Sequence, residues 1–77
     1  MDKINELDTV VLTRDLVEHG LERGDIGTVV HRYRDEAALE VEFVTGEGET
    51  VAVLTLKDKD VRLMRNGEIL HARERAA

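Results

Sequence analysis

Few side chains in this 77-residue sequence have the types and spacing that chemistry needs. The only histidines are His19, His31 and His71, and their spacing lacks the close pairs that hold a metal ion together with carboxylates. The chain has neither cysteine nor serine, which excludes a thiolate or a serine hydroxyl as nucleophile. We therefore predict no catalytic residue, no metal site and no cofactor.

Two charged segments have a superficial likeness to reactive sites. Asp58 and Asp60 alternate with Lys57 and Lys59, whereas a pair of catalytic carboxylates needs a cleft that separates their pKa values. Alternating charges in a short turn are normally solvated. The loop 46–49 contains two glycines, but its two glutamates would repel a phosphate and no helix follows. The sequence thus predicts a protein that is not an enzyme.

The formal net charge of −6 bears on the class of partner. An acidic chain repels phosphate at long range, which argues against general nucleic-acid binding. A local basic patch is still conceivable, and its candidates are Arg14, Arg23, Arg32, Arg34 and Arg62. Tyr33 and Phe43 are the only aromatic residues, so stacking platforms for bases are scarce. Nucleic-acid binding is therefore kept as the alternative hypothesis.

Targeting signals are not found in the sequence. No apolar run approaches the ~20 residues that a membrane-spanning helix needs. The first residues, 1–4, lack the charged and apolar regions of a signal peptide. We expect a cytoplasmic protein that does not enter a membrane.

The stretch 21–30 is expected to form a tight turn followed by a strand, and the rest of the domain is organised around them. Gly24 can adopt a positive φ, and Asp25 can hydrogen-bond nearby backbone in a tight turn. Gly27 falls inside the strand that follows, where a glycine marks a bulge, a sharp bend or the close approach of another backbone. We therefore predict a structural turn at Gly24 and Asp25, and a sharply curved strand at Gly27.

Alternating and β-branched residues predict five short strands, at residues 9–13, 25–33, 39–43, 50–56 and 61–63. A long polar loop, residues 14–24, separates the first two strands, and residues 57–60 are expected to form a 3₁₀ turn. Regular alternation in the second strand would place Val29, His31 and Tyr33 on one face.

The C-terminal residues 66–77 are compatible with three structures. Asn66-Gly67 is a strong hairpin signal, the residues that follow favour a helix by propensity, and the end of a chain often frays. The strand order as a whole resembles an SH3-like barrel. We predict one all-β domain over residues 1–77, a small five-stranded SH3-like barrel in which residues 66–77 add a hairpin strand, a short helix or a tail.

Several segments resemble a family of short bacterial proteins that is known only as a domain of unknown function. The similarity covers about residues 4–65, and its motifs are Glu6–Leu16, Glu18–Leu21, Arg23–Val30 and Leu39–Phe43. The family pattern tends to have proline where this chain has Val17. The Gly-Asp-x-Gly-Thr-Val motif alone is also similar to SH3-like domains of the nitrile hydratase β-subunit type and to ribosomal KOW modules, which implies a fold but no activity.

Apolar residues exceed what one small core can bury, because adjacent positions such as Val29 and Val30 are both apolar. This surplus predicts contact with a partner. The candidate contact residues lie on the long loop and near the C-terminus, namely Leu16, Val17, Leu21, Met64, Ile69 and Leu70. The alternative is that these residues only close the two ends of the barrel.

We interpret the sequence as a non-catalytic protein-binding module, a small accessory or antitoxin-like protein. Its acidic charge suits steering toward a basic partner. The expected partner is another protein encoded nearby, and association with further copies of the same chain stays open. An SH3-like or KOW-like module that binds nucleic acid is the alternative.

Overall fold

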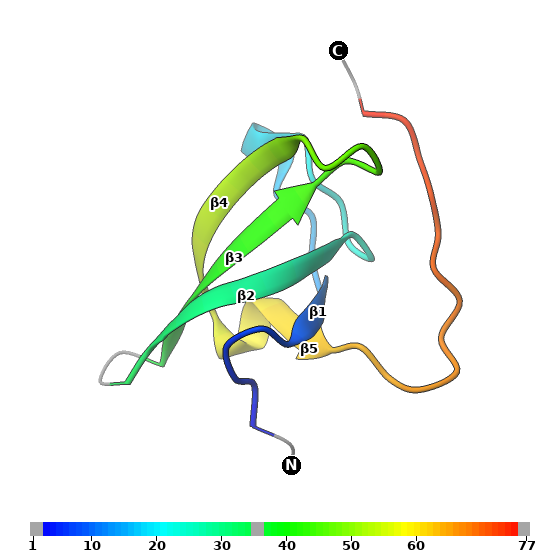
Figure 1. The fold of residues 1–77 in the computed structure, drawn as a ribbon. Coiled ribbons are helices and arrows are strands. Elements are labelled where there is room, and N and C mark those ends of the chain that lie inside the picture. The colour runs from blue at the N-terminus through cyan, green and yellow to red at the C-terminus, as the bar shows by residue number, and fades with distance from the viewer. Residues whose placement is uncertain (1–2, 35–36, 76–77) are drawn as a thin grey trace.

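The computed structural model describes residues 3–34 and 37–75, which form a single antiparallel sheet (Figure 1). Its strands follow the order β4-β3-β2-β1-β5. They are β1 (Thr9–Leu12), β2 (Ile26–Tyr33), β3 (Ala38–Val44), β4 (Thr50–Lys57) and β5 (Val61–Leu63). The prediction of an all-β domain with five strands is confirmed, and the arrangement is consistent with an SH3-like barrel.

Two short 3₁₀ turns complete the fold. The first, η1 (Val17–His19), lies in the long loop between β1 and β2, and the second, η2 (Asp58–Asp60), joins β4 to β5. The predicted 3₁₀ turn is thus confirmed at η2. In the described part of the chain, no helix has the length and apolar character needed to cross a membrane.

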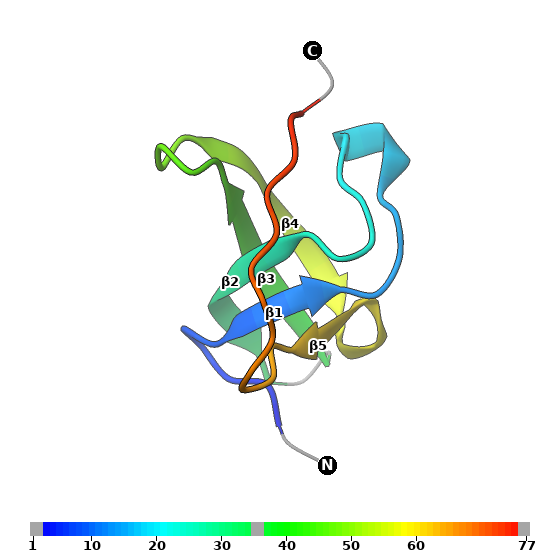
Figure 2. The same cartoon turned by 90° about the vertical axis from the view of Figure 1, so that its right-hand side faces the viewer.

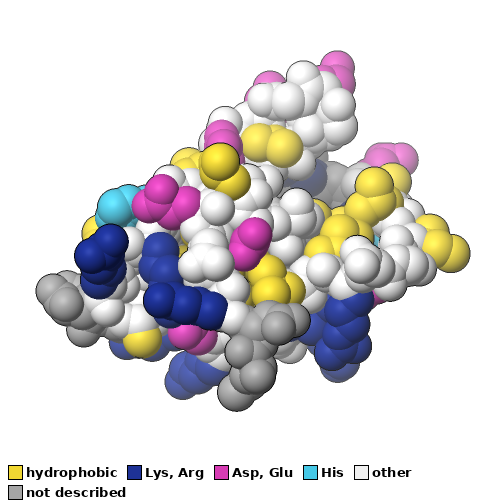
Figure 3. All heavy atoms as spheres, turned by 60° about the horizontal axis from the view of Figure 1, so that its bottom comes forward, with side chains coloured by type: hydrophobic (Ala, Val, Ile, Leu, Met, Phe, Trp, Pro, Cys, Tyr) yellow, Lys and Arg dark blue, Asp and Glu magenta, His cyan; other side chains and the backbone are white. Residues whose placement is uncertain are grey.

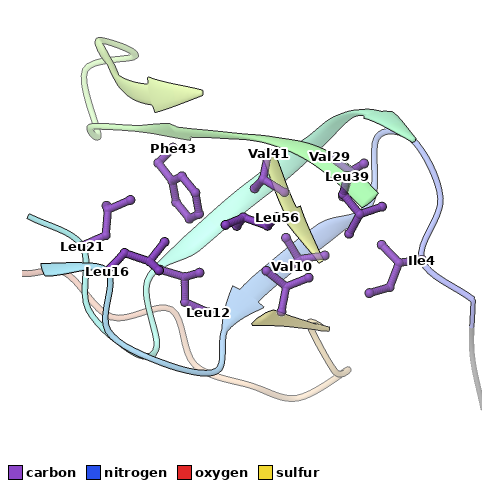
Figure 4. Packing of buried hydrophobic residues seen from close by; sticks show 11 residues of the cluster. Ile4, Val10, Leu12, Leu16, Leu21, Val29, Leu39, Val41, Phe43 and Leu56 are labelled. Atoms are coloured by element: carbon purple, nitrogen blue, oxygen red, sulfur yellow. The ribbon is translucent and has the colours of Figure 1, made fainter. Parts of the chain in front are cut away.

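The core lies between two layers of the curved sheet. Figure 2 shows β1 and β5 in front of β3 and β4. The side chains of Leu39, Val41 and Phe43 in β3 are buried, as their strict alternation predicts. They meet Val10 and Leu12 of β1 in the cluster drawn in Figure 4. The sheet therefore closes over one hydrophobic core.

Gly27 makes the tight curvature possible. A Cβ atom at this position would lie 2.6 Å from Val41 Cγ1, 2.9 Å from Phe43 Cε1 and 3.1 Å from the Glu42 carbonyl oxygen. No side chain fits in that space, so the Val41 and Phe43 side chains can pack across β2 at this point only because residue 27 is glycine. Of the three alternatives for Gly27, the structure shows a close approach, which involves two side chains and one backbone oxygen of β3.

The second strand departs from its predicted alternation. The pairing of β2 with β3 shifts between Val29, which pairs with Val41, and His31, which pairs with Glu40. Val30 is the extra residue of this β-bulge and is exposed. The prediction that His31 and Tyr33 share the face of Val29 is therefore wrong. Arg32 takes the core side instead, opposite Leu39.

As far as residue 75, where the described part of the chain ends, the C-terminal segment forms neither the hairpin nor the helix. Residues 64–75, here called the C-terminal arm, contain no strand or helix. A turn at Asn66-Gly67, with Gly67 at φ 85°, redirects the chain. The arm then runs extended along the side of the domain, and its far part lies beside the start of β2 (Figures 1 and 2). Of the three alternatives, the described residues follow the tail extension.

Candidate functional site

The near end of the C-terminal arm is fixed to β5 by an ion pair. The Arg62 guanidinium donates two hydrogen bonds to the Glu68 carboxylate, of 2.8 and 2.7 Å. The backbone N–H of Arg65 donates a third to the same carboxylate. These hydrogen bonds, above all those from Arg62, lower the pKa of Glu68 to about 2. Glu68 thus stays ionised and holds the turn at Asn66-Gly67 closed.

The far end of the arm is fixed to the predicted structural turn. Arg73 Nε donates to Asp25 Oδ1 at 2.9 Å, and one terminal nitrogen donates to Asp25 Oδ2 at 2.6 Å. The same terminal nitrogen reaches the Gly20 carbonyl oxygen at 2.9 Å. Partial burial raises the pKa of Asp25, but hydrogen bonds from Arg73 and the Glu22 backbone bring it below its usual value. Asp25 is therefore charged and binds Arg73 at neutral pH.

Asp25 and Gly24 also have the turn roles that the sequence predicts. The Asp25 carboxylate accepts a hydrogen bond of 2.8 Å from the Glu22 backbone N–H. Gly24 has φ of 95°, in the left-handed region, and its N–H donates to the Leu12 carbonyl oxygen at 2.9 Å. The structural turn is confirmed, whereas no sequence pattern indicates the contact with Arg73.

Between its two fixed ends the arm presents apolar side chains to solvent. Ile69 is 92% exposed and Leu70 is 69% exposed. In the part of the chain that the structure describes, the backbone of residues 69–75 makes no backbone–backbone hydrogen bond. This segment is thus extended and tethered, and the side chains of Ile69 and Leu70 are available to a partner.

A groove of about 520 Å³ separates the arm from the domain. Its domain wall carries apolar residues that include Ile26, Phe43 and Val51, and its other wall is formed by residues 71–75 of the arm. The face that comes forward in Figure 3 shows hydrophobic side chains on its right, the side on which the arm lies in Figure 1. The arm and the groove together form the main candidate site.

The six predicted contact residues fall into different environments. Leu16 and Leu21 are only 3% and 5% exposed, and both belong to the core cluster. Their backbones pair with each other through hydrogen bonds of 2.9 and 3.2 Å. They close one end of the core. Leu16 is not free to meet a partner in this conformation, whereas Leu21 also lines the domain wall of the groove.

The remaining predicted contacts are more accessible. Val17, in η1, is 83% exposed, but Figures 1 and 2 both show η1 apart from the arm. Met64 is half-buried, and its N–H donates to the Thr9 carbonyl oxygen at 3.0 Å. Of the six predicted contact residues, Ile69 and Leu70 are therefore exposed side by side on the arm, and Val17 is exposed elsewhere on the surface.

The arginines that might have formed a basic patch are largely neutralised within the molecule. Arg14 pairs with the buried Asp60 at 2.9 Å. Arg32 donates to both oxygens of Asp58 at 3.1 Å and to the Ile4 carbonyl oxygen at 3.0 Å. Arg62 is occupied by the arm, as described above. These three guanidinium groups are therefore poorly placed to bind phosphates.

A second hollow, of about 560 Å³, is lined by three cationic side chains. It is lined by Lys3, Asn5, Glu6, Arg32 and Arg34, and Lys and Arg side chains gather on the left of the face in Figure 3. Glu6 Oε2 also lies 3.1 Å from His31 Nδ1. The carboxylates of Glu6 and Asp58 thus offset the positive charge around this hollow.

Residues 6–63 match the family described as "Domain of unknown function (DUF4926)". The chain belongs to this family. The matched range includes all five strands of the domain and ends where the arm begins. No curated protein and no solved structure matches this chain. Membership in the family agrees with the resemblance found in the sequence and assigns no activity.

Proposed function

We propose that this chain is a non-catalytic protein-binding module, a cytoplasmic accessory or antitoxin-like protein that binds and blocks a partner protein. The observation that carries the proposal is the exposed pair Ile69 and Leu70 on a segment that ion pairs hold extended at both ends. Adjacent exposed large apolar side chains are typical of interaction sites, and residues 71–75, which follow them directly, line the groove.

The tethers make such a contact energetically favourable. Burying an aliphatic side chain contributes about 1.5–3 kcal/mol, but binding must also order the segment that carries it. The pairs Arg62–Glu68 and Arg73–Asp25 already restrict the arm before a partner arrives. A partner therefore gains from contact with Ile69 and Leu70 at a reduced entropic cost.

Charge supports the choice of partner. The net charge of −6 speeds the encounter with a basic protein and slows the encounter with nucleic acid. A basic partner is typically one that binds an anionic substrate such as RNA, and an acidic protein can block its site. The acidic surface therefore favours the role of an inhibitor over that of a nucleic-acid-binding module.

The test uses the immobilised chain to capture its partner from the cells that encode it. Affinity is then measured with the purified captured protein by isothermal titration calorimetry. Combined Ile69→Asp and Leu70→Asp substitutions are expected to weaken binding by more than roughly tenfold, since each aliphatic contact exceeds the ~1.4 kcal/mol that tenfold represents. The melting temperature should not change, because both side chains are exposed.

Leu7→Asn is the matched control, because Leu7 is 80% exposed but lies outside the arm. It should bind as the parent chain does. Retained affinity in the doubly substituted arm would contradict the proposal. Capture of nucleic acid alone, with an affinity that falls steeply with salt, would establish the alternative.

A further inference from the structure

Besides the C-terminal arm, the outer edge of β4 is a second candidate surface for binding a partner. β4 lies at one end of the strand order and pairs with β3 alone in the described part of the chain. It is eight residues long. The strand at the opposite end of the sheet, β5, has only three residues. The edge of β4 is therefore long enough to pair with a further strand.

This edge lacks most of the features that keep edge strands from pairing. Natural edge strands are protected by charges, prolines, bulges or short length. β4 contains no proline, and its only charged residue is Lys57 at its end. A register shift between Phe43 and Val44 marks a bulge that affects only the hairpin end, near Thr50. From Ala52 to Lys57 the pairing with β3 is regular, so the outer edge of this part is a regular template.

The outer face next to this edge is acidic, and Lys57 is the one basic residue that β4 places on it. Glu40 and Glu42 of β3 pair with Thr55 and Val53 of β4. Glu40 accepts a hydrogen bond from the Thr55 hydroxyl, and Glu42 accepts one of 2.8 Å from the Thr50 hydroxyl. Among the described residues, neither glutamate takes part in an ion pair. Two carboxylates thus flank the open edge with only neutral partners.

We propose that the β4 edge accepts an extended strand from a partner protein that carries Lys or Arg at alternate positions. Side chains on one face of a strand recur at every second residue, and neighbouring strands lie about 4.8 Å apart. Basic side chains on the outer face of an added strand would cross β4 beside Thr55 and Val53. A Lys or Arg side chain extends about one and a half strand spacings. The Glu40 and Glu42 carboxylates already reach over β4, to the hydroxyls of Thr55 and Thr50, so the opposite charges can meet.

The same charges disfavour a second copy of this chain as the occupant. Pairing of two β4 edges would bring a second Glu40 and a second Glu42 onto one continuous face, and each copy carries a net charge of −6. Repulsion between these like charges on one face, and between the two net charges, disfavours this pairing. The charge pattern therefore selects a basic strand over self-association.

Strand addition at β4 does not depend on the arm, and its test keeps the two sites apart. The probe is a synthetic peptide of about seven residues in which Lys alternates with Val and Thr, added to the ¹⁵N-labelled chain. Amide signals of residues 50–57 are expected to shift and their hydrogen exchange to slow. The control peptide has the same sequence but is N-methylated at alternate positions, which removes donors to β4. It should bind at least roughly tenfold more weakly, because strand addition depends on main-chain hydrogen bonds.

Substitutions test the charge contribution. Glu40→Gln combined with Glu42→Gln should weaken binding of the unmodified peptide by about three- to tenfold, since exposed ion pairs contribute little individually. Glutamine keeps the acceptor for the threonine hydroxyls, so the fold should persist. Glu47→Gln, in the exposed β3–β4 loop, is the matched control and should have no effect.

Three outcomes would overturn the inference. The first is that the peptide changes amide chemical shifts only outside β4. The second is that the N-methylated peptide binds with the same affinity as the unmodified one. The third is that the chain forms a dimer through β4 without any peptide. The chain with Ile69→Asp and Leu70→Asp should bind the peptide as the parent does. The result on β4 therefore stands or fails separately from the function proposed for the arm.

Discussion

Arg73 and Asp25 are 48 residues apart in the sequence, yet their side chains form a two-pronged ion pair. The pair joins the far end of the C-terminal arm to the turn that precedes β2. Asp25 is held in place by the Glu22 N–H, so it offers Arg73 a preformed acceptor. The position of the arm thus depends on a turn whose own geometry is fixed locally.

Arg73→Ala is expected to release the far half of the arm while the sheet stays folded. NMR order parameters of residues 69–75 should fall to about 0.6 or below, the range of flexible backbone. The loss in free energy of unfolding should not exceed about 1 kcal/mol, because the pair is partly exposed. Arg75→Ala is the control, since Arg75 makes only a 3.7 Å contact with Glu49. Unchanged order in the Arg73 variant would show that other contacts hold the arm.

Gly27→Ala is expected to destabilise the domain by about 1–3 kcal/mol, because the new methyl group would overlap Val41 and Phe43. Chemical denaturation measures the difference. Gly46→Ala is the matched control, because nothing lies within 4 Å of a Cβ at that position. Equal stability of the two variants would mean that the sheet can open at Gly27 without cost.

Leu16→Asp and Ile69→Asp should differ in their effect on the free energy of unfolding, because Leu16 is a core residue and Ile69 is a surface residue. Leu16 belongs to the buried cluster, so an aspartate there should cost at least about 3 kcal/mol. Ile69 is exposed, and its substitution should change the free energy of unfolding by less than about 0.5 kcal/mol. Thermal unfolding of both variants, followed by circular dichroism, provides the comparison. A large loss of stability in the Ile69 variant would place that residue in the packed structure.

The pair Arg62–Glu68 should contribute to stability in a defined pH range. The pKa of Glu68 in the folded chain is about 2, below its ordinary value of 4.5. The folded state therefore favours the ionised carboxylate, and the contribution is complete above about pH 4.5 and lost as the pH falls toward 2. The melting temperatures of the parent and of Glu68→Gln should differ by a constant amount above pH 4.5 and converge toward pH 2. If the two melting temperatures begin to converge well above pH 4.5, the stabilisation does not come from the ionised Glu68 carboxylate.

The strands were predictable because local patterns determine them. Leu39, Val41 and Phe43 alternate with glutamates, and such a pattern fits only a strand with one buried face. The role of Gly27 was predictable because glycine weakens a strand interior and is kept there where the backbone bends or a neighbour comes close. No sequence pattern predicts the bulge at Val30, because Val29 and Val30 are equally suited to a strand interior.

The candidate site was less predictable because it depends on contacts between distant segments. The loop residues Leu16 and Leu21 and the arm residues Ile69 and Leu70 have similar apolar character in the sequence. Only the tertiary structure buries the first pair and exposes the second. The ion pair of Arg73 with Asp25 likewise has no local pattern, because its partners share no secondary-structure element.

The bulge at Val30 also makes one residue of β2 dispensable for strand pairing. Val29 and His31 occupy successive positions opposite Val41 and Glu40. Deleting Val30 would therefore leave every other residue of β2 on its present face, whereas deleting a neighbour on the regular part would exchange the two faces. A bulge increases the local twist of a strand, so the shortened strand would keep its partners and form a flatter sheet.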